Sequence, residues 1–525
     1  MLILILSLSR LAVYFDGFLP SSKRAERVKR LLKSTRELQN FYHAFSNGVQ
    51  KDREQFVANP KAVDLFPKSW GGEARTKAPA PAFLVPAIIE ALKASTKYAS
   101  LTEVMPGEAD LFCARRIRQS GGIVLTHDSD LLIHDLGPEG SVLFFSDIDL
   151  GSPDSGSRSR PIVGLHFKIS EICERLSIKP DHGLAHLAFE LVMDPHISLE
   201  QAASRSRREA AVSCYPKFYT EFIEQYLTPE TAVMADVSGL DIDPRVAEIA
   251  LKSAQSGTTH EGEIAMFLPL LLDSPSRTSA WEASKPTREL AYALLQYAVD
   301  SNIVAVSEFR RLQSPSAGVR IDVAKVSTLD RECDKLLSAL STIRADVISS
   351  EATWLTYALY EDIILTNSQG KTRSLSFELL QKDAAGKLNP YSWDSVHLVA
   401  QIQASYYSMR MLQQILAFAK QERKELPESM GQLLDRLESL PRLASFPSLN
   451  NCAEVLKTAR SNPVLSCLAS LGRDIEDIKA QIDAIERPRE AAKETKKRKR
   501  QQKGQEVSQK RVVASNNPFD LLGTD

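Results

Sequence analysis

The sequence predicts an α/β core with a mainly parallel sheet, followed by a large all-α region and a disordered basic tail. Three observations support this fold class. Over the first 200 residues, short apolar runs alternate with helical patterns, as in chains that build parallel sheets. Beyond about residue 166, long stretches with helical spacing of apolar residues dominate. From residue 487 the chain is charged and almost free of aromatic residues, a composition too polar to form a core.

We therefore expect three parts, residues 1–200 as the α/β domain, 201–486 as the helical region and 487–525 as the tail. In the first part, apolar runs predict strands at 11–15, 100–104, 123–126 and 142–145. Helical spacing predicts helices at 21–45, 81–95 and 109–119. A Ser- and Gly-rich stretch at 151–161 indicates a linker or exposed loop.

In the remainder of the chain, the apolar spacing predicts a series of helices. They are expected at residues 166–176, 184–193, 245–255, 264–272, 287–300, 329–349, 351–365, 394–422, 428–438 and 470–486. No internal repeat is evident, and an irregular helical array is left as an open alternative.

The charge balance excludes a uniformly basic protein that coats nucleic acid. Lys+Arg number 65 and Asp+Glu 66, a net charge of −1, but residues 487–525 hold 11 basic and 5 acidic residues, 11 − 5 = +6, which leaves −7 for the rest. No run approaches the roughly 18 apolar residues of a membrane span, so no membrane association is expected. The six cysteines form no CxxC pair, which argues against a structural zinc site and suggests a reducing compartment.

Acidic residues gather at the ends of predicted strands and at the start of a predicted helix. They are Asp16, after the first strand; Glu108 and Asp110, at the opening of the helix at 109–119; and Asp128 and Asp130, after the strand at 123–126. Because the carboxyl ends of neighbouring parallel strands converge on one crevice, we expect a negative cluster there. Mutual repulsion disfavours such a cluster unless cations bind, and Mg²⁺ or Mn²⁺ prefers oxygen ligands. Two such ions could clamp a phosphodiester during hydrolysis.

Three segments that contain these acids resemble motifs of the flap-endonuclease superfamily of PIN-like nucleases. The segments are Val13-Tyr14-Phe15-Asp16-Gly17, Pro106-Gly107-Glu108-Ala109-Asp110 and Thr126-His127-Asp128-Ser129-Asp130-Leu131-Leu132. A fourth, the stretch from Leu187 to Asp194, is similar to the helix that ends in the family's last metal-site aspartate. The resemblance covers about residues 11–200. It implies a PIN-like core that uses one or two Mg²⁺ or Mn²⁺ ions to hydrolyse DNA or RNA, with Asp194 as a further ligand.

The resemblance also assigns roles to basic residues. Lys23 and Arg30 stand seven and fourteen residues after Asp16, the spacing of the family's Lys and Arg that contact the reacting phosphate. Together with Arg24 and Arg27 on the same basic stretch, they are expected to bind nucleic acid. Lys23 and Arg30 would be the catalytic cations, steadying the phosphate as its charge develops.

The second half of the chain resembles the fungal Asteroid group, which attaches a large helical region to a nuclease-like core. The resemblance lies in residues 266–271, 274–282 and 288–292, which include Arg277, Trp281 and Arg288. For these three side chains we favour internal packing, with the tryptophan in a groove and an arginine stacked or paired nearby.

Two departures from the family favour an alternative, a catalytically impaired PIN-like scaffold that binds RNA or protein partners through its helical region. Only 15 residues precede Asp16 and none is acidic, so the family's opening strand with another metal-binding aspartate is missing, or the gene model starts late. After Asp194, residues 195–202 lack the glycines of the family's duplex-gripping turn, which puts that mode of DNA binding in doubt.

The remaining candidates carry weaker signals. His127 alternates away from the face of Asp128, and His182, His186 and His196 lack the partners of a zinc site, so none is expected to bind metal. Cys113 is expected to be a small buried residue and not a nucleophile. The tail carries a compact basic cluster, Lys496, Lys497, Arg498, Lys499 and Arg500. It predicts a nuclear-import signal, and hence a nuclear protein, with a nucleic-acid-binding arm or a solvated charge run as alternatives and the cytoplasm as the alternative location.

Overall fold

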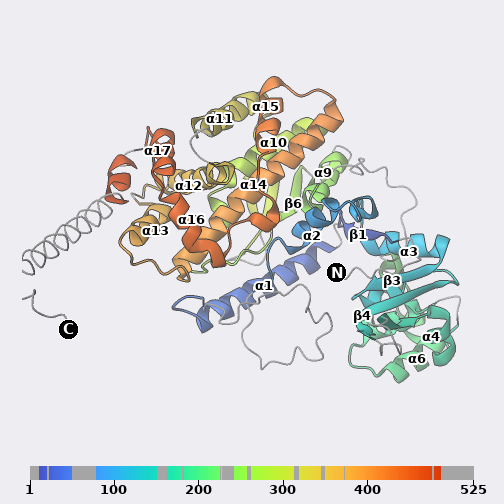
Figure 1. Ribbon diagram of the computed structural model, residues 1–525. Helices are drawn as coiled ribbons and strands as arrows, with labels where there is room; N and C mark the ends of the chain where they lie inside the picture. Colours follow the sequence, from blue (N-terminus) through green and yellow to red (C-terminus); the bar gives the residue numbers. More distant parts are fainter. Residues whose placement is uncertain are drawn as a thin grey trace, which may run out of the picture.

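The computed structural model describes residues 11–19, 23–49, 79–150, 162–179, 183–224, 226, 242–256, 262–311, 318–343, 349–371, 373–475 and 478–485. The expected linker at 151–161 and the basic tail lie outside these ranges. Figure 1 shows a large helical body and a smaller α/β lobe, with the first strand between them. Among the described residues, no helix combines the length and the apolar character needed to cross a bilayer.

The first strand, β1 (Val13–Asp16), pairs in parallel with β2 (Thr102–Met105), so that Asp16 lies beside Met105. Helix α3 (Ala109–Ser120) follows β2 and packs on β1. It ends at Gly121, where φ is 66°. This left-handed conformation is one that glycine adopts without strain, and it lets the next strand begin at once.

The α/β lobe is built on a second sheet. Strands β3 (Gly122–Thr126) and β4 (Gly140–Leu150) are parallel, whereas β5 (Ile162–Phe167) joins β4 in antiparallel fashion. Short helices complete the lobe: α4 (Ile169–Leu176), α5 (Ala185–Met193), α6 (Leu199–Arg207), α7 (Ala210–Cys214) and α8 (Pro216–Glu224). The expected strands are present, but the sheet is not the single, mainly parallel one that we expected.

The region expected to be all-helical contains a third sheet. Strand β6 (Glu263–Phe267) pairs in parallel with β7 (Ala305–Phe309), and β8 (Val319–Asp322) runs antiparallel to β7. The prediction of a helix at 264–272 was therefore wrong. A short continuous apolar run is compatible with either a buried strand or a buried helix, because both faces of each are apolar.

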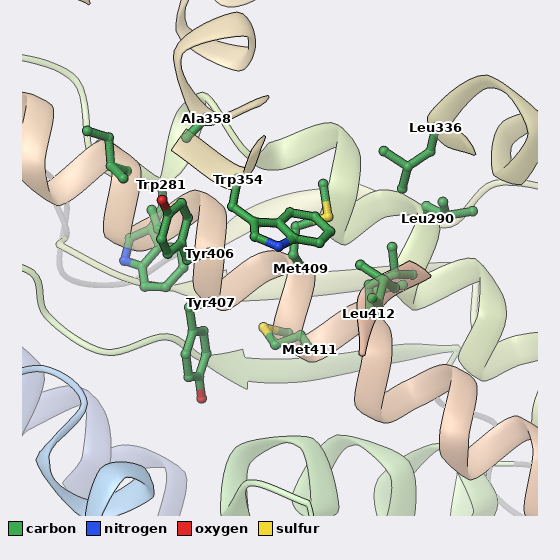
Figure 2. Packing of buried hydrophobic residues seen from close by; sticks show 14 of the residues in the cluster. Trp281, Leu290, Leu336, Trp354, Ala358, Tyr406, Tyr407, Met409, Met411 and Leu412 are labelled. Atoms are coloured by element: carbon green, nitrogen blue, oxygen red, sulfur yellow. The ribbon is translucent and has the colours of Figure 1, made fainter. Parts of the chain in front are cut away.

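Helices form the rest of the body around one extensive apolar core. They are α9 (Pro244–Ser256), α10 (Lys285–Val299), α11 (Leu329–Thr342), α12 (Ser350–Ser368), α13 (Leu375–Ala384), α14 (Trp393–Arg423), α15 (Glu428–Leu437), α16 (Cys452–Ala459) and α17 (Asn462–Leu471). The 31-residue α14 runs through the middle of the body, buried along most of its length. Figure 2 shows Tyr406 and Tyr407 of this helix beside Trp281, Met409 beside Trp354, and Leu412 toward Leu290.

The expected internal packing of Trp281 and Arg288 is confirmed. Trp281 is buried and donates its indole N–H to the carbonyl of Pro269 at 3.0 Å. Arg288 is also buried, with its guanidinium 5.3 Å from the Trp281 ring. Arg277 is partly exposed and forms two hydrogen bonds to Asp394, at 2.7 and 3.2 Å. All three therefore hold the body together.

Two early helices lie on the late body. Helix α1 (Arg24–Ala44) packs Val28, Leu31 and Leu32 against Phe267 and Phe309, at the ends of β6 and β7. Its other end reaches α14, where Trp393 donates its indole N–H to the carbonyl of Phe45 at 2.7 Å. Helix α2 (Leu84–Lys93) also docks there, through an ion pair of 2.9 Å between Glu90 and Arg410. Segments from the first 100 residues thus pack across the boundary that we expected at residue 200.

Candidate acidic site

The five acids of the predicted cluster come from two different sheets and from the helix that joins them. Asp16 ends β1, and one of its carboxylate oxygens accepts the backbone N–H of Ala109 at 2.7 Å. This bond joins the end of β1 to the first turn of α3, the turn that carries Glu108 and Asp110. A carboxylate at a helix N-terminus is favoured because the first N–H groups of a helix have no partner within it.

Asp128 and Asp130 occupy the turn after β3. The Asp128 carboxylate accepts the backbone N–H of Asp130 at 3.0 Å and so caps the short 3₁₀ helix Ser129–Leu132. Asp130 is the more enclosed of the two. Burial and the charge of Asp128 raise the pKa of Asp130, while Lys23, a hydrogen bond from Tyr226 and Arg30 oppose the increase.

Asp110 shows that the five acids share one electrostatic environment. Its pKa is raised to about 6, first by burial and then by the charges of Asp16, Asp128, Glu108 and Asp130. Like charges raise the pKa of a carboxyl group only when they lie near it. The structure therefore brings together the five acids that the sequence placed in one cluster, although they do not lie on a single sheet.

Tyr226 is a member of the site that the sequence did not indicate. Its phenol is hydrogen-bonded to the Asp130 carboxylate, and burial together with the charges of Asp130, Asp128 and Glu108 raises its pKa to about 12. The ring packs edge-on against that of His134, with 5.3 Å between the centroids. Nothing in the local sequence sets this tyrosine apart, because it reaches the cluster only through the fold of the lobe.

Of the four predicted cations, Lys23 and Arg30 act on the acidic cluster, whereas Arg24 and Arg27 contact the body. The ammonium of Lys23 lies 3.4 Å from the Glu108 carboxylate. Arg30 is 78% exposed on its side chain and pairs with Glu26 at 3.2 Å. Its charge also acts on Asp130, so Arg30 faces the same region.

Arg24 and Arg27 contact the body, and their expected role in binding nucleic acid stays a prediction. The Arg24 guanidinium lies 5.2 Å from the centre of the Phe309 ring. That of Arg27 lies 3.9 Å from the Phe267 ring and 2.5 Å from the Glu248 carboxylate. A fixed positive charge over an aromatic face is a favourable contact. These two arginines therefore anchor α1 to the body.

Asp194 makes different contacts from those expected. It caps the end of α5, where its carboxylate pairs with Arg205 at 3.3 Å and accepts the backbone N–H of His196 at 3.4 Å. No contact in the described part of the chain joins it to the other acids. The structure thus unites five of the six expected metal ligands and gives the sixth an arginine as partner.

The donor set suits a hard divalent cation in chemistry, because it offers five carboxylates and an excess of negative charge. The side-chain positions are less suitable. Among the described residues, no group of three or more His, Cys, Asp or Glu side chains is arranged to hold a metal ion. Cys113 is unsuited to act as a nucleophile, since burial and the nearby charges of Asp110 and Asp16 raise its thiol pKa to about 12.

One comparison with known proteins gave a match. A family model described as "XPG domain containing" matches residues 80–323. This range begins before β2, includes the acids from Glu108 to Asp194, and continues through β8. No curated protein and no solved structure matched the chain.

The match supports the placement of this chain in the XPG-like, flap-endonuclease superfamily, whose nuclease core is PIN-like. An XPG-like domain of this kind also indicates nucleic-acid binding. The matched range extends past residue 200 and takes in the sheet of the helical body, so the XPG-like segment of the chain includes part of the region that we had set apart.

Proposed function

We propose that this protein is an Asteroid-like, metal-dependent nuclease that acts on DNA or RNA phosphodiesters. The observation that carries the proposal is the shared environment of the five acids, in which four carboxylates act on the pKa of Asp110. An excess of negative charge at one place in a folded protein is costly without a bound cation. The match to an XPG-like domain supplies the substrate class, nucleic acid.

In this proposal Asp16, Glu108, Asp110, Asp128 and Asp130 hold one or two Mg²⁺ or Mn²⁺ ions. A bound ion would polarise the phosphate and favour an attacking hydroxide. Arg30, exposed on α1, offers a guanidinium to the phosphate as its charge develops. Tyr226 orients the carboxylate of Asp130 through its phenol. Asp194 joins the ligand set only if its pair with Arg205 opens.

The decisive experiment is cleavage of branched and single-stranded DNA and RNA by the purified full chain, with Mg²⁺ or Mn²⁺ and with chelator. We expect cleavage only with the metal, and none by Asp128→Asn. As a matched control, Asp135→Asn removes an exposed carboxylate that pairs with Arg118 outside the cluster, and it should cleave normally. Cleavage that persists in excess chelator would reject the mechanism.

A second candidate is a PIN-like scaffold without catalysis, which binds RNA or protein partners through the helical body. It is favoured by the partners that the acids already have, an N–H for Asp16, Lys23 for Glu108 and Tyr226 for Asp130. A protein that binds RNA with the same affinity in Mg²⁺ and in chelator, and that never cleaves it, would match this candidate. For both candidates we propose a nuclear location set by the basic cluster at residues 496–500.

A further inference from the structure

The body and the α/β lobe meet at the bend that follows β2 (Figure 1). Strands β1 and β2 belong with the body, because Phe18 and Val104 pack against its main apolar core. Helix α3 belongs with the lobe, since Ala114 shares an apolar cluster with Val142 of β4. Each cluster of buried apolar side chains among the described residues lies wholly on one side of this bend. No shared apolar core therefore joins the lobe to the body where the structure describes them.

The sheets also end at this boundary. Strand β1 pairs with β2, and β3 pairs with β4. Among the described residues, no strand of the body pairs with a strand of the lobe. A ladder of backbone hydrogen bonds across the boundary would hold the two parts in one register. Each part is instead paired within itself.

The side-chain contacts across the boundary are polar. They run from the Arg116 guanidinium to the Tyr14 hydroxyl at 2.9 Å, from the Ala109 N–H to the Asp16 carboxylate at 2.7 Å, and from the Lys23 ammonium to the Glu108 carboxylate at 3.4 Å. Two parts of a chain that meet through a polar interface are expected to move relative to one another, whereas a large apolar interface would hold them still. The described contacts across the boundary are of the first kind.

The bend provides the pivot. Residues 106–108 connect β2 to α3 and belong to neither element. Gly107, in the middle, has the wide backbone freedom of glycine. A Cβ at this position would lie 3.0 Å from the Phe112 ring, so a larger residue would fit only after a shift. A few residues at the ends of elements are sufficient to form a hinge between domains. The return of the chain to the body, at 227–241, lies outside the described residues.

We propose that the α/β lobe swings as one unit about residues 106–108, and that this motion opens and closes the acidic site. Asp16 stays with the body, whereas Asp110 and Asp130 move with the lobe. Closure brings the carboxylates of Asp16 and Asp110 near each other, and opening relieves their repulsion. The inference goes beyond the proposed function, because the motion is the same whether the protein cleaves nucleic acid or only binds it.

The test measures distances between pairs of spin labels on the full-length chain by double electron–electron resonance. The pair across the boundary uses the exposed native Cys214 of the lobe and Val304→Cys in the body. A control within the lobe pairs Cys214 with Leu165→Cys, and a control within the body pairs Val304→Cys with Lys33→Cys after Cys214→Ser. The partly buried Cys113 is replaced by alanine in every labelled protein. We expect a broad or two-peaked distribution for the pair across the boundary and a narrow one for each control.

Tyr14→Phe provides a second measurement, because it removes the hydroxyl that Arg116 contacts. A net hydrogen bond corresponds to roughly a two- to tenfold change in an equilibrium constant, so the ratio of long to short distances should rise by about that factor. Tyr42→Phe, which removes a hydroxyl from α1 within the body, should leave the ratio unchanged. Melting temperatures confirm that each variant is folded. A distribution across the boundary that is as narrow as both controls, before and after Tyr14→Phe, would overturn the hinge.

Discussion

Arg288 and Glu308 face each other in the interior of the protein, joined by two hydrogen bonds of 2.6 and 3.0 Å, and neither side chain is exposed. Tyr292 donates a further hydrogen bond to the same carboxylate at 2.8 Å. Burial pushes the pKa of Glu308 upward, but the charge and hydrogen bonds of Arg288 outweigh it, so the pKa lies below its ordinary value. The pair ties α10 to β7 at the centre of the body.

Loss of one partner of this pair should be severe. Arg288→Met leaves the Glu308 charge buried without its main partner, and we expect the free energy of unfolding to fall by about 3–5 kcal/mol. Urea denaturation measures it. The matched control is Arg320→Met, since Arg320 is half-exposed and pairs with Glu263 at the surface; its loss should cost about 1 kcal/mol or less. Similar losses at the two positions would show that the buried pair is not a central support.

The acidic cluster should make stability depend on pH. The pKa of Asp110 is raised to about 6, so the folded protein holds this proton more tightly than the unfolded chain does. The stabilising contribution of Asp110 is complete at pH values below its pKa in the unfolded chain, near 4, and is lost as the pH rises through about 6. Unfolding of the metal-free protein at several pH values measures the effect.

Asp110→Asn should flatten this dependence and stabilise the metal-free protein at pH 7 by about 1–2 kcal/mol, allowing for screening by solvent. Asp135→Asn, outside the cluster, should leave the pH profile as it is. A profile that Asp110→Asn does not change would mean that Asp110 titrates as it does in an unfolded chain.

The docking of α1 should depend on Phe267 and Glu248. Phe267→Ala removes a ring that packs on Arg27 and on the apolar side of α1, and a cost of about 3 kcal/mol is typical of such a change. Glu248→Gln leaves the ring in place and weakens the ion pairs of Glu248 with Arg27 and Lys252. Hydrogen exchange of residues 24–44 should become faster in both variants. Val304→Ala, at an exposed site of the body, should leave the exchange unchanged.

We expect the tail to determine where the protein is located in the cell and to contribute little to its stability. Because its sequence is too polar to pack a core, deletion of residues 487–525 should leave the melting temperature nearly unchanged. A fluorescent fusion should move from nucleus to cytoplasm when the five cations at 496–500 are replaced by Gln. If the fusion stays nuclear while nucleic-acid affinity falls and loses its salt dependence, the tail is a binding arm. A large fall in melting temperature would contradict both roles.

The features that could be predicted from the sequence are those whose signal lies within a short stretch of the chain. The acids were found because they follow strands or open a helix, and such positions are visible in a short window. Tyr226 and the α1 contacts of Arg27 were missed, since they depend on residues distant in the chain. The strand β6 was taken for a helix because burial on both faces removes the periodicity that separates the two. In sequence, Arg24 and Arg27 are basic residues of the same stretch as Lys23. Only their positions in the structure give the three side chains different partners.

The contacts between α1 and α14 have a consequence during synthesis. Phe45 and Trp393, joined by a hydrogen bond, are separated by 348 positions along the chain. At about 5–20 residues per second, a ribosome needs roughly 20–70 s to make the second residue after the first. Throughout that interval Phe41, buried against Trp393 in the finished protein, lacks this partner and is more open to aggregation. We therefore expect the nascent chain to depend on chaperones until α14 emerges from the ribosome.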